Sequence, residues 1–64
     1  MTVNQIKRAV DKGMKVHWVN ELYVVIKDRY GRYLIHCTAN DSFTGLTWRD
    51  GVTLNGSEQE FYIG

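Results

Sequence analysis

The chain has 64 residues, one cysteine, no proline and a net charge of +1, and 44% of its residues are hydrophobic. A domain of this size buries a marginal core, and one cysteine with two scattered histidines provides neither an internal disulfide nor the paired spacing of a structural zinc site. No apolar run is long enough to span a bilayer, and the near-neutral charge argues against a strongly basic nucleic-acid-binding protein. We therefore expect a single domain over residues 1–64 that binds no metal and no cofactor.

The charges are unevenly distributed along the chain. Residues 1–32 carry seven Lys or Arg against three acids, a balance of +4, whereas residues 33–64 carry one against four, a balance of −3. A basic N-terminal half can attract phosphate or an acidic partner, although a solvated helix face with turns explains the same pattern. The start Met1-Thr2-Val3-Asn4-Gln5 lacks the basic and then apolar blocks of a signal peptide, so we expect a cytoplasmic protein.

The N-terminal segment has the pattern of one amphipathic helix of about three turns. Thr2 and Gln5 form a capping box, and Gly13 is well placed to end the helix in a left-handed conformation. One stripe at helical spacing is apolar: Val3, Ile6, Val10 and Met14. A helix this short is unstable alone in water, so we expect it to dock on a sheet.

Three strand-like runs follow with almost no spacer: Lys15 to Val19, Leu22 to Lys27 and Arg32 to Thr38. Asn20-Glu21 would make a tight turn between the first two runs. Asp28-Arg29-Tyr30-Gly31 has the composition of a four-residue hairpin loop whose last residue has positive φ. This succession predicts an α+β fold, in which the helix packs on a small, strongly curved antiparallel meander of about four or five strands that is open or barrel-like.

If the hairpin pairs Lys27 with Arg32, alternation gives the sheet two apolar faces. The first face comprises Leu22, Val24, Ile26, Tyr33, Ile35 and Cys37, and the second comprises Trp18, Tyr23, Val25 and Leu34. The predicted core lies on the first face and comprises Val3, Ile6, Val10, Val24, Ile26, Ile35 and Cys37, with Trp48 closing it. One short helix covers only one face. The second face is therefore either the interior of a barrel closed by residues 39–64 or an interface with a second subunit.

The last third of the chain contains further turn signals. Asn40-Asp41-Ser42 favours a turn, Gly45 to Arg49 is typical of a short strand, and Asp50-Gly51 is typical of a tight hairpin leading into Val52 to Leu54. A second capping pattern begins at Ser57. Ser57 to Tyr62 is therefore either one helical turn or an edge strand, and the capping pattern favours the turn.

The titratable residues do not form a catalytic constellation. His36 and Cys37 are neighbours on a strand, so their side chains point to opposite faces and cannot act together as base and nucleophile. No carboxylate is placed to orient His17, and the acids cluster at turns and caps, where carboxylates usually satisfy backbone amides. We expect a protein that is not an enzyme.

Binding of a macromolecule is the remaining class of function. Aromatic and arginine side chains are enriched where proteins meet, and the candidates for contacting a partner are Trp18, Tyr23, Arg29, Tyr30 and Arg32. Trp48 and Arg49 are further anchors if an interface exists, although we expect Trp48 to pack in the core over the hairpin. An unidentified protein partner or self-association is the first interpretation. The alternative is a nucleic acid that stacks on aromatic residues of the sheet beside Lys27, although no RNA-binding motif is present.

Five segments carry a resemblance to known proteins: Lys15 to Trp18, Tyr23 to Asp28, Gly31 to Cys37, Gly45 to Gly51 and Thr53 to Gly56. In this order, and over nearly its whole length, the chain resembles a group of short proteins encoded in bacteriophages and prophages. The resemblance brings no known activity, ligand or active-site residue. It implies a small accessory protein in a bacterial host cell that acts by binding host or phage macromolecules.

Overall fold

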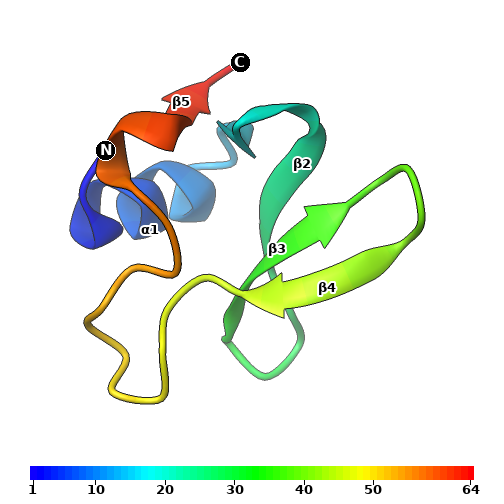
Figure 1. Cartoon of the computed structure of the whole chain (residues 1–64). Coiled ribbons are helices and arrows are strands. Elements are labelled where there is room, and N and C mark those ends of the chain that lie inside the picture. The colour runs from blue at the N-terminus through cyan, green and yellow to red at the C-terminus, as the bar shows by residue number, and fades with distance from the viewer.

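One helix lies against one face of a five-stranded antiparallel sheet in the computed structural model, which describes residues 1–64 (Figure 1). The elements are α1 (Val3–Asp11), β1 (Val16–Trp18), β2 (Asn20–Lys27), β3 (Tyr33–Cys37), β4 (Ser42–Gly45), the 3₁₀ helix η1 (Glu58–Glu60) and β5 (Phe61–Ile63). The strand order is β4-β3-β2-β1-β5, so β4 and β5 are the two edges. The predicted α+β class is confirmed, and the sheet stays open rather than closing into a barrel.

The sequence pattern of α1 explains where the helix starts and ends. The Thr2 side chain accepts a hydrogen bond of 3.2 Å from the Gln5 N–H, and the Thr2 N–H donates one of 2.9 Å to Gln5 Oε1. Gly13 follows the helix with a φ of +83°, a conformation that glycine adopts without steric cost. With nine residues α1 is too short to cross a bilayer, and the structure has no other α-helix.

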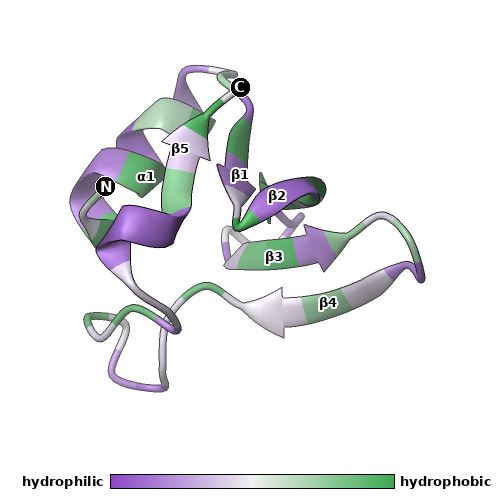
Figure 2. Cartoon of the chain, turned by 45° about the horizontal axis from the view of Figure 1, so that its top comes forward, coloured by the Kyte–Doolittle hydropathy of each residue, from purple (hydrophilic) through white to green (hydrophobic).

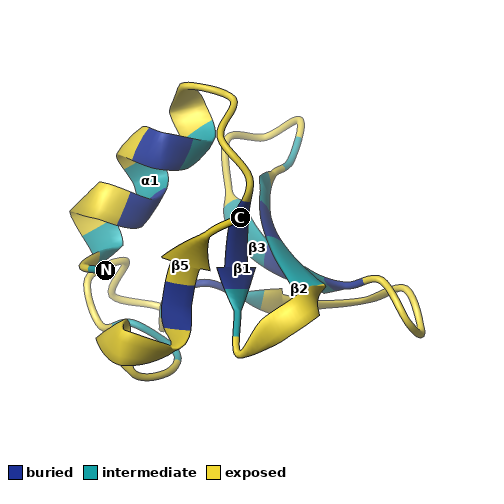
Figure 3. Cartoon of the chain, turned by 90° about the horizontal axis from the view of Figure 1, so that it is seen from above, coloured by how far each residue is buried: buried dark blue, intermediate teal, exposed yellow.

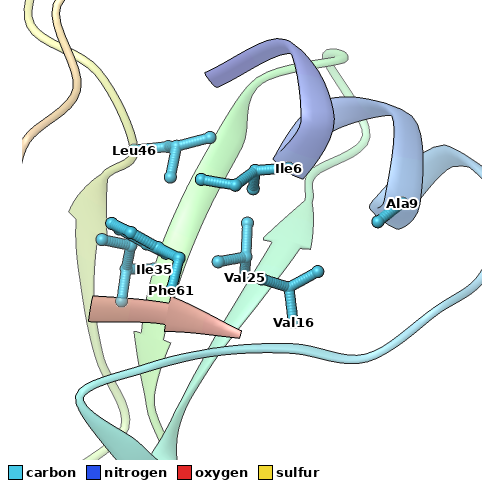
Figure 4. Packing of buried hydrophobic residues seen from close by; sticks show 7 residues of the cluster. All are labelled: Ile6, Ala9, Val16, Val25, Ile35, Leu46 and Phe61. Atoms are coloured by element: carbon cyan, nitrogen blue, oxygen red, sulfur yellow. The ribbon is translucent and has the colours of Figure 1, made fainter. Parts of the chain in front are cut away.

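The hydrophobic core lies between α1 and the sheet (Figure 3; Figure 4). It comprises Ile6, Ala9, Val16, Val25, Ile35, Leu46 and Phe61, which come from the helix, from four of the strands or their ends, and from the loop after β4. Ile6, Val16, Ile35 and Leu46 are its fully buried side chains. Because these side chains come from distant parts of the sequence, their burial holds the helix, the sheet and the C-terminal strand together.

The register of the β2–β3 hairpin differs from the prediction by one residue. Lys27 pairs with Tyr33 rather than with Arg32, so the connecting loop has five residues. Asp28 causes the difference: its Oδ1 accepts the Arg32 N–H at 2.8 Å and its Oδ2 accepts the Arg32 Nε–H at 2.7 Å, which keeps Arg32 inside the loop. A shift of one residue exchanges the two faces of a strand.

The exchanged faces correct the predicted core. Ile35 and Cys37 are buried as predicted, but Val25 is the β2 residue that reaches the core, and Val24 and Ile26 lie on the opposite face. The predicted second face is divided as well. Trp18 and Tyr23 pack against the core cluster with Val25, whereas Leu34 belongs to the side away from the helix, because it neighbours Ile35 on β3. These differences between the predicted and observed faces of β2 and β3 all follow from the single register shift.

The helix contribution to the core is narrower than its apolar stripe. Ile6 is buried as predicted and Ala9 is buried beside it, while Val3 and Val10 are only half-buried. Met14 is 43% exposed. The helix therefore inserts one large side chain into the core and packs the rest of the stripe at its margin.

The structure corrects the prediction for the segment after β3. β4 spans Ser42–Gly45, so the strand predicted over Gly45 to Arg49 is displaced toward the N-terminus and the turn before it begins at Thr38. Leu46, and not Trp48, closes the core, and Trp48 is 66% exposed. The Asp50-Gly51 turn forms with a φ of +72° at Gly51, but the hairpin around it is reduced to one bridge, Thr47 to Leu54.

The connection between β1 and β2 differs from the prediction, and the C-terminal segment combines the two predicted alternatives. The turn expected at Asn20-Glu21 does not form, since Val19, with a φ of +68°, joins β1 directly to β2. The segment from Ser57 combines the two alternatives: η1 forms first, and β5 then pairs antiparallel with β1, with Trp18 opposite Phe61. The helical turn is thus correct for Glu58–Glu60, and the edge strand is correct for the residues that follow.

Candidate functional site

The sheet face that points away from α1 carries apolar and aromatic side chains with no element covering it. We call this surface the open face; its residues are His17, Leu22, Val24, Ile26, Leu34, His36, Phe43 and Tyr62. The assignment follows from strand alternation, because the neighbours Val16, Val25, Ile35 and Phe61 point into the core on the other side. In Figure 2 the β3–β4 hairpin extends away from α1, with hydrophobic bands on β3 and one such band on the otherwise pale β4.

One row of the open face crosses the whole sheet. The register places Tyr62 opposite His17, His17 opposite Val24, Val24 opposite His36, and His36 opposite Phe43, so that each strand contributes one residue. The His36 and Phe43 rings stack with their centroids 4.5 Å apart and their planes 9° from parallel. The His17 and Tyr62 rings lie 5.4 Å apart. Each end of the row is therefore a pair of rings, a histidine with an aromatic residue, and Val24 lies between the two pairs.

The open face is partly exposed, and the Asp41 carboxylate lies beside it, in contact with His36. Phe43 is 54% exposed, Leu22 50% and Tyr62 39%. A second row next to the first pairs Ile26 with Leu34. None of the eight residues is Lys, Arg, Asp or Glu, because the charged side chains of β2, Glu21 and Lys27, alternate onto the other side. An exposed apolar surface of this kind is typical of contact with another apolar surface.

The two histidines of the open face have different roles. His17 is 6% exposed, and its Nδ1 lies 3.1 Å from the Tyr23 carbonyl oxygen. Since a carbonyl only accepts, Nδ1 carries the hydrogen and the ring bridges β1 to β2. Gly64 lies so close to this ring that a Cβ at that position would overlap it. His17 is therefore a packed structural residue.

His36 is the more accessible histidine. Its Nε2 lies 2.6 Å from Asp41 Oδ1, and its side chain is 24% exposed. Cys37, the adjacent residue, is 8% exposed and faces the core, on the opposite side of β3. His17 and His36 are separated by β2, a distance of about 10 Å at ordinary strand spacing. No acid, base and nucleophile thus meet on this face.

The structure divides the five residues predicted to contact a partner into two groups. Trp18 and Tyr23 contact each other edge to face at 5.0 Å and pack against the core cluster. Trp18 also donates from Nε1 to Glu60 Oε1 at 3.4 Å. Both side chains are half-buried on the helix side of the sheet, where they stabilise the fold.

The other three predicted residues form the tip of the β2–β3 hairpin. Tyr30 is 74% exposed, and the Arg32 guanidinium lies 5.2 Å from the centre of its ring. Arg29 is exposed beside them. Trp18 and Tyr23 lie at the opposite end of β2 from this tip, about 15 Å or more away by strand length. The two groups do not form one site.

The sequence pattern does not predict several residues of the open face. It places the strands that carry Phe43 and Tyr62 differently, and it predicts Val24 and Ile26 in the core. The signal that identifies the face is Asp28, which can hold Arg32 in the loop and so set the register. If the loop between the two strands has five residues, the same alternation predicts that Val24, Ile26, Leu34 and His36 lie on the same face of the sheet.

No protein-family model, curated protein or solved structure matches this chain.

Proposed function

We propose that the protein is a non-catalytic protein-binding module that uses its open face as the contact surface, with a second copy of the chain as the occupant. The observation that carries the proposal is the row of cross-strand neighbours from Tyr62 to Phe43, which is exposed at both ends and is buried only at His17, where Gly64 packs on the ring. As part of this proposal, the module acts as a small accessory protein of a phage or prophage in a bacterial host cell, which is what the resemblance of the sequence implies.

A protein surface fits this face better than a nucleic acid does. Base stacking needs aromatic rings with cations beside them to hold the phosphates, and the open face has aromatic rings without Lys or Arg. An apolar surface with few charges is what the buried centre of a protein interface offers. This chemistry supports the protein partner over the nucleic-acid alternative on this face.

A second copy meets the chemical requirement by symmetry. Two open faces in contact would bring their uncharged central residues together, with the Asp41 carboxylate beside His36 at the edge, and they would pack as two sheets of a sandwich about 10 Å apart. Self-association also adds buried area to a domain whose own core is small. Five strands at about 4.8 Å spacing make the face about 24 Å wide, and three residues in alternation make it about 13 Å long. Because this area lies below that of a standard interface, we expect a weak dimer at high protein concentration.

Sedimentation equilibrium over a wide concentration range tests the proposal. We expect the mass to rise from monomer toward dimer, and the variant Phe43→Lys to remain monomeric because the dimer would bury an unpaired charge. Tyr30→Lys is the matched control: it replaces an aromatic residue of similar exposure, 74% against 54%, outside the open face, and it should associate like the wild type. A wild type that is monomeric throughout, or a Phe43→Lys variant that associates equally well, contradicts the proposal.

A further inference from the structure

A cleft of about 380 Å³ lies between α1, the β2–β3 loop and the loop that follows β4. We call it the basic cleft. It is lined by Lys7, Gly31, Arg32, Tyr33, Leu34, Gly45, Thr47, Trp48, Arg49 and Gly51. Figure 1 shows the two loops at the same end of the molecule. The volume falls within the range of small-ligand sites, and the lining differs from the open face in having cations.

The cations of the basic cleft are available to a ligand. Lys7, Arg32 and Arg49 line it, and no acid is among its ten lining residues. Lys7 and Arg49 make no ion pair in the protein, and Arg32 engages Asp28 through Nε alone, at 2.7 Å. The outer nitrogens of the Arg32 guanidinium are therefore left without a protein acceptor. Three cations with free donors around one cleft favour an anion with several oxygens, such as phosphate.

Trp48 is the most informative residue of the basic cleft. Its side chain is 66% exposed, although a tryptophan is among the side chains that gain most from burial. The loop around it is well hydrogen-bonded: the Trp48 N–H donates to the Thr53 carbonyl at 2.9 Å, and the Trp48 carbonyl accepts the Gly51 N–H at 2.9 Å. Asp50 Oδ1 accepts the N–H groups of Val52 and Thr53. A structured loop thus presents the indole ring to solvent beside Arg49.

Tyr33 supplies a second ring whose position is fixed. Its hydroxyl donates to Asp11 Oδ1 at 2.7 Å, and the Lys7 and Lys27 ammonium groups lie 5.3 Å and 5.4 Å from the ring centre. Lys7 is thereby held at the wall of the cleft. The cleft consequently offers the exposed Trp48 side chain and two cations held by neighbouring residues, Lys7 and Arg32, with Arg49 next to Trp48 in the chain.

We propose that the basic cleft binds single-stranded nucleic acid, with a base stacked on Trp48 and the adjoining phosphate held by Arg49, Arg32 and Lys7. Stacking on an exposed aromatic residue beside cations is the general mode of sequence-tolerant single-strand binding. The hairpin tip favours a strand over a free nucleotide. Arg29 and Tyr30 continue the basic and aromatic surface beyond Arg32, where a neighbouring nucleotide would lie and a mononucleotide would not reach.

Fluorescence anisotropy of a labelled twelve-nucleotide oligothymidylate, measured from about 50 to 200 mM NaCl, tests this proposal. Each phosphate contact to a single strand contributes a slope of about −0.7 to the dependence of log affinity on log salt. We expect a slope of about −0.7 for the wild type, because one phosphate is held in the cleft, and a slope nearer zero for Arg49→Ala. Trp48→Ala should weaken binding about tenfold with little change in the salt slope.

Arg8→Ala is the matched control for Arg49→Ala. Arg8 is an exposed arginine of α1 that lies outside the basic cleft, so its removal changes the net charge equally and should leave the affinity unchanged. Trp48 and Arg49 are exposed, and thermal unfolding monitored by circular dichroism should show that both variants fold. Equal losses for Arg8→Ala and Arg49→Ala would mean diffuse charge attraction and would overturn the assignment of the site.

Competition distinguishes the sources of the phosphate and the base. Unlabelled oligothymidylate should displace the probe at a far lower nucleotide concentration than thymidine monophosphate, and inorganic polyphosphate should compete less well because it cannot stack. Thymidine monophosphate that competes equally would identify a free-nucleotide site, and polyphosphate that competes equally would remove the role of Trp48; either result overturns the proposal. Phe43→Lys should bind the oligonucleotide at least as well as the wild type, so this inference and the proposed dimer can fail separately.

Discussion

The Tyr33 hydroxyl donates a hydrogen bond of 2.7 Å to Asp11 Oδ1 and so joins β3 to the last residue of α1. Lys27 approaches the same carboxylate oxygen at 3.4 Å from β2. These polar contacts lie at the margin of the core, on the side of the sheet that the helix covers. They connect three elements through one exposed acid.

The Tyr33–Asp11 bond lowers the pKa of Asp11, and the Lys27 ammonium adds to the effect. In the variant Tyr33→Phe we expect the pKa of Asp11 to rise toward its ordinary value of 3.8 while the Lys27 contribution remains. Because the folded pKa is depressed, the stabilisation that it provides is present above the unfolded pKa and is lost as the pH falls through the folded one. The carboxyl carbon shift of Asp11, followed by NMR during an acid titration, measures the change. An unaltered Asp11 titration in Tyr33→Phe would show that the bond does not form in solution.

Asp50 should contribute to acid unfolding of the Trp48 loop. The Thr53 hydroxyl, the Thr53 N–H and the Val52 N–H donate to its carboxylate and lower its pKa to about 2. The stabilisation is complete above the unfolded value of 3.8 and is lost as the pH falls from there toward about 2. Asp50→Asn should therefore flatten the dependence of the melting temperature on pH in this window. A dependence as steep as that of the wild type would locate the acid sensitivity elsewhere.

A pair of identical substitutions tests the register of the β2–β3 hairpin. Ile35 is 2% exposed in the core, so Ile35→Ala should lower the free energy of unfolding by about 2–5 kcal/mol, enough to unfold much of so small a domain. Ile26 lies on the open face and is only half-buried, so Ile26→Ala should cost about 1 kcal/mol or less. Urea unfolding followed by tryptophan fluorescence gives both values. If both variants lose the same free energy of unfolding, or if Ile26→Ala loses more, the result would support the register that pairs Lys27 with Arg32.

Gly31 of the hairpin loop should tolerate alanine poorly. Its φ of +82° is one that residues with a Cβ adopt at a cost of about 1–2 kcal/mol, and asparagine is the residue that best accepts it after glycine. We expect Gly31→Ala to destabilise the protein and Gly31→Asn to destabilise it less. No side chain crowds the position, since an added Cβ would meet only the end of Lys27 at 4.0 Å. Thermal melts of the two variants give the order, and its reversal would contradict the positive φ.

Local patterns in the sequence were enough to predict the elements whose signals are short-range. The capping box at Thr2 and Gln5, the apolar spacing of the helix and the glycine at position 13 define α1 without reference to the rest of the chain. The alternation of apolar residues likewise defines the two long strands, and the closeness of the runs requires antiparallel pairing. These features depend on hydrogen bonds and side-chain contacts between residues about four positions apart or fewer. Such neighbours can be identified directly in the sequence.

Only the tertiary structure decided which face each strand buries and what closes the core. The register depends on Asp28 holding Arg32 in the loop, and one residue of slip is enough to exchange Val24 and Ile26 for Val25. The choice of Leu46 over Trp48 as the closing residue depends on where β4 ends, and the pairing of β5 with β1 joins residues more than forty positions apart. The packing of residues that are distant in the sequence selects among such alternatives, and the local sequence pattern does not report which distant residues will pack together. The open face and the basic cleft both arise from those long-range choices, so the sequence alone determined the kind of fold, whereas its binding surfaces required the assembled sheet.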